Sequence, residues 1–108
     1  MNNRRNLNDD GSAWVLFKPN GYPFRLRKQL REASRDEEVL EIMIPYILGL
    51  HLPKTSGDGA VNKLNSVDDI EEVDEAVATQ LVMQFYEFRG ERNMAPVPKN
   101  SSPPSQDT

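Results

Sequence analysis

The sequence predicts an α+β fold that is mostly helical, with an N-terminal β-hairpin followed by two main helices and with disordered polar termini. Aromatic and β-branched residues fill positions 13–17, as is typical of a strand. Apolar residues recur every three or four positions over 66–90, which indicates a long amphipathic helix. The two ends of the chain carry too few apolar side chains to offset the entropy of ordering them.

Length and composition limit the chain to one small domain. Of its 108 residues, about 80 belong to the part that we expect to fold. We expect a flexible leader over residues 1–11, a helical domain with a β-hairpin over 12–92, and a disordered Pro- and Ser-rich tail over 93–108. A core of this size is marginally stable unless further apolar surface is covered, so we expect a homo-oligomer.

Composition also excludes several kinds of site and location. The chain contains no cysteine, which excludes disulfides and thiolate metal sites. Its N-terminus lacks the apolar region of a signal peptide, and its longest apolar run, around residues 42–50, is too short to span a bilayer. We therefore expect a soluble, cytoplasmic protein that has no membrane partner.

The predicted hairpin joins two short strands through a turn. Residues 13–17 form the first strand, and Pro19, Asn20 and Gly21 supply the turn chemistry. Apolar and polar residues then alternate over 22–27, which predicts the second strand. Pro23 cannot donate a backbone hydrogen bond, so this strand lies at a sheet edge. We hypothesise that the edge mediates self-association through its large apolar side chains, Tyr22, Phe24 and Leu26.

A first helix is predicted from residue 35 towards residue 50. Ser34 and Glu37 have the spacing of a capping box, and apolar residues follow at helical spacing. Pro45 lies inside this segment and lacks the N–H that a helix needs, so we expect it to kink the helix or to divide it after Ile44. Residues 51–65 contain Pro, Gly, Ser and Asp in a pattern that indicates a loop.

The second helix carries the apolar stripe. Ser66 can cap it, carboxylates occupy its first turns, and Gly90 is a natural C-terminal stop. A stripe of this length needs a covering surface, so we hypothesise that its C-terminal part binds a partner protein through Leu81, Phe85, Tyr86 and Phe88. The alternative is that Phe85 and Phe88 complete the domain core and that Tyr86 is half exposed.

No constellation of residues indicates catalysis, a cofactor or a metal. The six carboxylates of residues 68–75 fan around a helix instead of converging, so we interpret them as a solvated face. His51 is the single histidine, and a packing role suits its position between Leu50 and Leu52. Because a Gly-rich phosphate loop is also absent from the sequence, we expect a protein that is not an enzyme.

Charge is distributed unevenly along the chain. The net charge is −4, yet cations are concentrated in the first third and carboxylates in the rest, a polarity that could align copies head to tail. The basic segment 25–35 leaves an alternative open: a small regulatory or nucleic-acid-associated module that binds phosphates through Arg25, Arg27, Lys28 and Arg31. The acidic total and the lack of a recognition motif make nucleic acid the less favoured partner.

The order of features supports one family resemblance. A strand with Trp14, the turn at Asn20, a basic strand, an acid-capped helix, a late helix ending in Phe85-Tyr86-Glu87-Phe88-Arg89 and a Pro-rich tail follow one another. Over about residues 13–92, this layout resembles the small tail assembly chaperones of long-tailed, siphovirus-type bacteriophages.

That resemblance implies a non-enzymatic protein of the host cell cytoplasm. It would multimerise around the tape-measure protein, keep its helices soluble, and be displaced as the tail-tube protein assembles. The resemblance also implies a second, longer product made by programmed ribosomal frameshifting. Pro98 and Lys99 are compatible with a slippery codon pair at that place.

Overall fold

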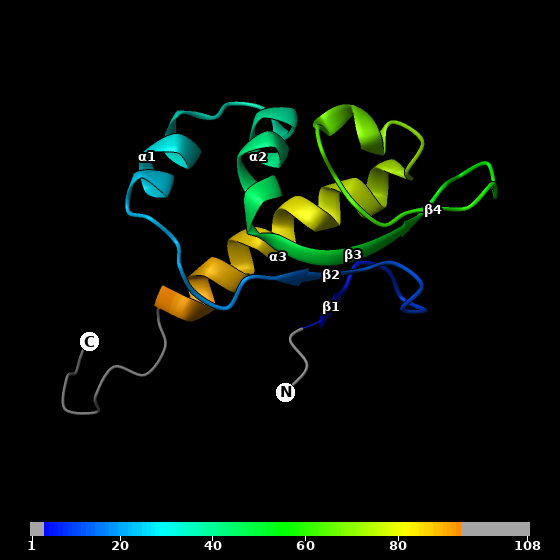
Figure 1. Cartoon of the computed structure of the whole chain (residues 1–108), viewed down its shortest axis with the longest axis horizontal. Coiled ribbons are helices and arrows are strands. Elements are labelled where there is room, and N and C mark those ends of the chain that lie inside the picture. The colour runs from blue at the N-terminus through cyan, green and yellow to red at the C-terminus, as the bar shows by residue number, and fades with distance from the viewer. Residues whose placement is uncertain (1–3, 94–108) are drawn as a thin grey trace.

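The computed structural model describes residues 4–93, and these form a four-stranded antiparallel sheet with the helices on one side of it (Figure 1). The spatial order of the strands is β1-β2-β3-β4. This arrangement confirms the predicted α+β class. The elements in chain order are β1 (Arg4–Asn6), β2 (Trp14–Phe17), α1 (Arg25–Glu32), α2 (Asp36–Met43), the 3-10 helix η1 (Ile44–Tyr46), β3 (Ile47–Pro53), β4 (Ala60–Val61), the 3-10 helix η2 (Val67–Ile70) and α3 (Glu75–Asn93).

The core lies between the sheet and α3, which crosses the sheet from end to end in Figure 1. Phe17 from β2 and Leu52 from β3 are fully buried, as are Leu81 and Phe85 from α3. The rings of Phe17 and Phe85 are tilted against each other with their centroids 5.3 Å apart. Met43 at the end of α2 is also fully buried, so helix and sheet share one core.

Residues 4–6 belong to the sheet, which contradicts the prediction of a flexible leader over residues 1–11 for the part of that segment that the structure describes. β1 pairs with β2, with Arg5 opposite Val15, and Leu7 is buried. The composition of residues 1–11 does not predict this strand, because β1 is held in place by backbone pairing with β2 and by the side chain of Arg5. The Arg5 guanidinium donates to Gln84 at 2.7 Å and to Glu91 at 3.0 Å, which ties β1 to α3.

The predicted second strand over 22–27 is wrong, because this segment enters α1. Leu26 and Leu30 are buried one helical turn apart on the same face of the helix. Pro23 lies just before the helix, where its missing N–H is harmless, and its carbonyl accepts from the Leu26 N–H at 3.0 Å. The N-terminal hairpin therefore pairs β2 with β1, and β3 lies on the other side of β2.

The predicted first helix is much shorter than residues 35–50. α2 ends at Met43, and Pro45 lies in η1. Of the two outcomes expected at Pro45, a kink or a division, the structure shows the division. The remainder of the segment is β3, which pairs with β2 and continues to Pro53. The expected loop over 51–65 accordingly contains the end of β3 and the whole of β4.

The predicted second helix consists of two pieces. η2 begins at the expected cap, where Ser66 and Asp69 form a reciprocal capping box. The chain then leaves the helical path because the Thr55 N–H donates to the Glu72 carbonyl at 2.8 Å and because Val73 forms a bridge with Lys54. α3 continues past Gly90 to Asn93, so Gly90 does not end it. The predicted tail lies, from residue 94 onward, outside the described residues.

Candidate protein-interaction surfaces

The apolar stripe of α3 is covered by the chain's own sheet. Leu81 and Phe85 are 0% exposed and Phe88 is 9% exposed, and the ring of Phe88 lies 5.4 Å from that of Phe17. The hypothesis that these three side chains contact a partner is therefore wrong for this fold, and the alternative that Phe85 and Phe88 complete the core is confirmed. Tyr86 is 43% exposed on the other side of α3, so it is the one residue of the hypothesised set that a partner can reach.

The hypothesised self-association edge is absent, because its residues have different surroundings in the fold. The ring of Tyr22 stacks on that of Tyr46 at 4.8 Å, and its hydroxyl donates to the Lys18 carbonyl at 2.9 Å. Leu26 is fully buried. Phe24 alone stays accessible, at 80% exposed, just before the first residue of α1.

We define the cationic end as Phe24 with Arg25, Arg27, Lys28 and Arg31 on α1. All five side chains are exposed, and the Arg27 guanidinium lies over the Phe24 ring at 5.3 Å. No carboxylate within residues 4–93 forms an ion pair with any of these four cations. The first turn of α1 contains no acidic residue, although a helix N-terminus favours negative charge. Contact with an acidic surface of another molecule would reduce the repulsion among these four cations.

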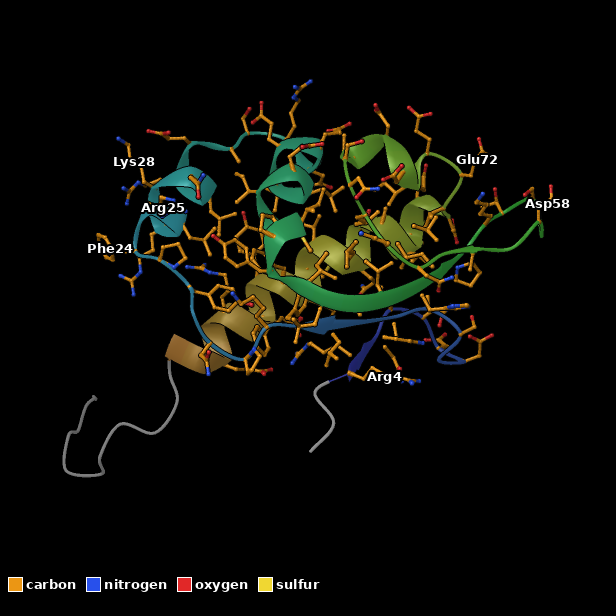
Figure 2. All side chains as sticks on the ribbon, in the orientation of Figure 1. Arg4, Phe24, Arg25, Lys28, Asp58 and Glu72 are labelled. Carbon is orange, nitrogen blue, oxygen red and sulfur yellow. The ribbon has the colours of Figure 1, made fainter. Side chains whose placement is uncertain are left out.

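The carboxylates of residues 68–75 form an acidic end at the opposite pole. Figure 2 shows Glu72 at one end of the molecule and Arg25 and Lys28 at the other. Asp69 accepts the backbone N–H groups of Asn65 and Ser66, and these hydrogen bonds lower the pKa of its carboxyl below the ordinary value. The other five carboxylates, Asp68, Glu71, Glu72, Asp74 and Glu75, are exposed. Within residues 4–93, no three His, Asp or Glu side chains converge as metal ligands.

The outer face of the sheet carries a stack of three side chains that is not covered by any helix within residues 4–93. The Arg4 guanidinium lies 4.4 Å from the centroid of the Trp14 ring, which stacks on His51 at 6.5 Å. His51 Nδ1 lies 2.9 Å from the Asn62 side-chain oxygen. These contacts give His51 the packing role expected from the sequence, although on a strand. Leu48 is 60% exposed on the same strand.

Comparisons of the chain with protein-family models, with curated proteins and with solved structures return no match. Over the part of the chain that the structure describes, no helix has both the length and the apolar character needed to cross a membrane. The surfaces described above are therefore the basis for a functional proposal.

Proposed function

We propose that this protein is a non-enzymatic tail assembly chaperone of a long-tailed bacteriophage. It multimerises and binds the tape-measure protein in the host cell cytoplasm until the tail-tube protein displaces it. The observation that carries this proposal is the separation of the cationic end from the acidic end (Figure 2). Opposite poles on one small domain favour head-to-tail contacts between copies, and such contacts produce rings or filaments. Assemblies of this kind suit a chaperone that coats a long protein.

The contact with the tape-measure protein is assigned to the outer side of α3. Met83 is 45% exposed and Tyr86 is 43% exposed, and these side chains lie one helical turn apart. Aromatic residues and Met are enriched in protein interfaces, and the flexible Met side chain adapts to varied partners. Of the residues hypothesised from the sequence, this assignment retains Tyr86. Met83 takes the place of the three buried residues, Leu81, Phe85 and Phe88.

Charge exchange tests the self-association. In one variant, Arg27→Glu and Lys28→Glu cancel the net positive charge of the four cations on α1. In a second, Glu71→Lys and Glu72→Lys remove most of the negative charge of the acidic end. We expect each variant alone to sediment as a smaller species than the wild type. An equimolar mixture should form heterodimers, because the intact acidic end of the first variant complements the intact cationic end of the second. Self-association that is unaffected by these changes and by 0.5 M salt would contradict the head-to-tail arrangement.

Co-expression tests the partner. The tape-measure protein from the same genome should copurify with the wild-type chain and with an exposed control, Glu87→Ala, but not with the double variant Met83→Ser and Tyr86→Ser. Failure of the wild type to copurify would remove the tape-measure assignment. The frameshift site implied at Pro98 and Lys99 lies outside the described residues. An immunoblot of the product of the native coding DNA should reveal a minor longer form.

A nucleic-acid-associated function is the second candidate, because the four cations of α1 could equally meet phosphates. Arg35, in the same basic segment, is already engaged by Glu38 at 3.5 Å. Binding to labelled single-stranded or duplex DNA or RNA that weakens steeply with salt and is lost in the Arg27→Glu, Lys28→Glu variant would favour this function. Binding that is absent at 50 mM salt would exclude it.

A further inference from the structure

One edge of β3 is only partly paired. On its β2 side, β3 pairs at Ile47 and from Gly49 to His51, with a register shift at Leu48 that places Ile47 and Leu50 on the same side of the strand. On the other side, β4 pairs with Leu52 and Pro53 alone. Within the described residues, positions 47–51 therefore have no strand on the β4 side. An open edge presents unpaired N–H and C=O groups, which an extended chain can satisfy by adding as a further strand.

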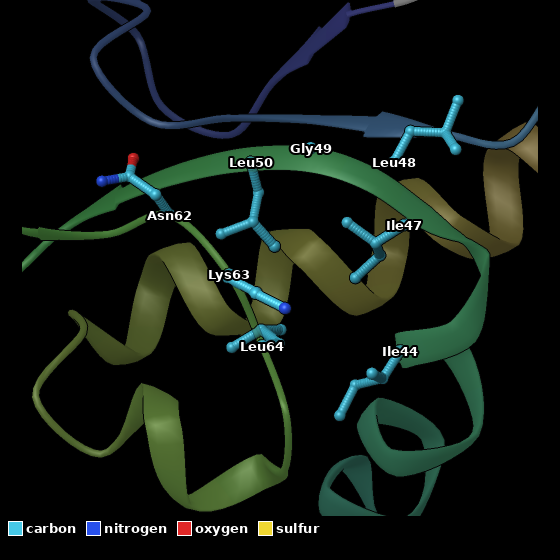
Figure 3. A pocket seen from close by; sticks show the side chains of 8 residues that line it. All are labelled: Ile44, Ile47, Leu48, Gly49, Leu50, Asn62, Lys63 and Leu64. Carbon is cyan, nitrogen blue, oxygen red and sulfur yellow. The ribbon is translucent and has the colours of Figure 1, made fainter.

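A hollow of about 340 Å³ lies directly beside this open edge, within the range of about 300–1,000 Å³ that is usual for ligand pockets. We call it the β3-edge pocket. Ile47 and Leu50 project into it from β3, whereas Leu48 projects to the opposite side of the strand (Figure 3). Ile44 and Leu64 complete the apolar part of the lining. Because side chains alternate along a strand, every second residue of an added strand would face this pocket.

The charge of the lining selects among possible occupants. Lys63 is exposed at the pocket and has no ion pair with any residue in 4–93, and the lining contains no carboxylate. Pairing of two copies through this edge would bring two Lys63 ammonium groups to one interface without a counter-charge. A different chain that carries a carboxylate is the complementary occupant.

We propose that the β3-edge pocket binds an extended segment of another protein, which adds to β3 as a fifth strand. The segment has large apolar side chains at alternate positions and an Asp or Glu opposite Lys63. Backbone hydrogen bonds supply the affinity, and the apolar side chains of the pocket together with its single cation supply the sequence preference. This surface is separate from the two charged ends and from the α3 contact, so the proposal does not depend on the proposed function.

Selection from a random heptapeptide display library on the full chain tests the preference. We expect enriched peptides to alternate apolar residues and to contain Asp or Glu. A synthetic copy of the most enriched peptide should bind Lys63→Glu on the order of tenfold more weakly than wild type, as measured by calorimetry. Lys28→Glu, an equally exposed reversal at the cationic end, should bind it unchanged. Enrichment of peptides without alternation or acidity, or no enrichment, would overturn the proposal.

Peptide backbone methylation tests strand addition without changing the protein. N-methylation at every second residue should abolish binding in one register and leave it intact in the other, because only one set of N–H groups faces β3. Bound peptide should also slow amide exchange within residues 47–51. Equal binding of both methylated peptides would overturn the proposal. If Lys63→Glu dimerised and still bound the peptide, the role of Lys63 would be to prevent two copies from pairing through this edge. That result would overturn the predicted preference for peptides with Asp or Glu.

Discussion

Truncation of Phe85 to Ala is the sharpest test of whether the α3 stripe belongs to the core. The Phe85 side chain is fully buried, with ring centroids 5.3 Å from Phe17 and 6.4 Å from both Tyr22 and Tyr46. Removal of the ring leaves a cavity bounded by the rings of Phe17 in β2, Tyr22 in the segment before α1, and Tyr46 in η1. These neighbours are each held by other contacts, so we expect the cavity to collapse only in part.

The size of the effect follows from that burial. A buried Phe→Ala change costs about 3–5 kcal/mol, against a total stability of roughly 5–15 kcal/mol for a small domain. With a urea slope of about 1.5 kcal/mol/M, the midpoint of unfolding should fall by about 2–3 M. Tyr86→Ala, the adjacent exposed position on the same helix, should change stability by no more than about 0.5 kcal/mol.

Urea unfolding followed by the fluorescence of Trp14 measures this effect, because Trp14 is the single tryptophan and stacks between Arg4 and His51. Phe85→Leu provides a milder variant, with an expected loss of about 1–2 kcal/mol. Equal midpoints for Phe85→Ala and Tyr86→Ala would refute the core assignment. In that case the stripe would again be a candidate for the partner interface.

Three further predictions concern the contacts that hold the chain ends and caps. Arg5→Met should lower the urea midpoint, because it releases β1 from Gln84 and Glu91, whereas Glu91→Gln should lower it less. Ser66→Ala should cost about 0.5–2 kcal/mol by removing the cap of η2, with the loss read from the thermal midpoint. Folding lowers the pKa of Asp69 and of Glu91, so their stabilisation is present above the unfolded value of about 4 and is lost as the pH falls through the folded value. Unfolding midpoints should therefore be flat from pH 5 to 7 and fall below pH 4, less so in Asp69→Asn.

Local chemistry explains where prediction from the sequence was accurate. The strand at Trp14–Phe17 is rich in aromatic and β-branched residues, and the cap at Ser66 is a short-range motif. Pro45 divided the helix because a missing N–H acts at its own position. Each of these features depends on residues within a few positions in the chain.

The errors share a different cause, which is contact between distant segments. β1 is too short and too polar to be recognised, and it is ordered by pairing with β2 and by Arg5 on α3. Residues 47–50 continue the apolar pattern of a helix, and pairing with β2 makes them a strand. Short apolar runs of this kind fit either period until a neighbour is known.

At the candidate surfaces, the order of residue types along the chain is enough to predict where basic, acidic and apolar side chains are concentrated, and hence the charge separation. Which of these side chains face solvent depends on how the segments pack in the fold. Packing buries Leu81, Phe85 and Phe88 in the core and leaves Tyr86 exposed. It also leaves the β3 edge beside Lys63 without a neighbouring strand among the described residues. The physical reason is that burial is a property of two surfaces together, and the covering sheet is assembled from strands that are distant in sequence.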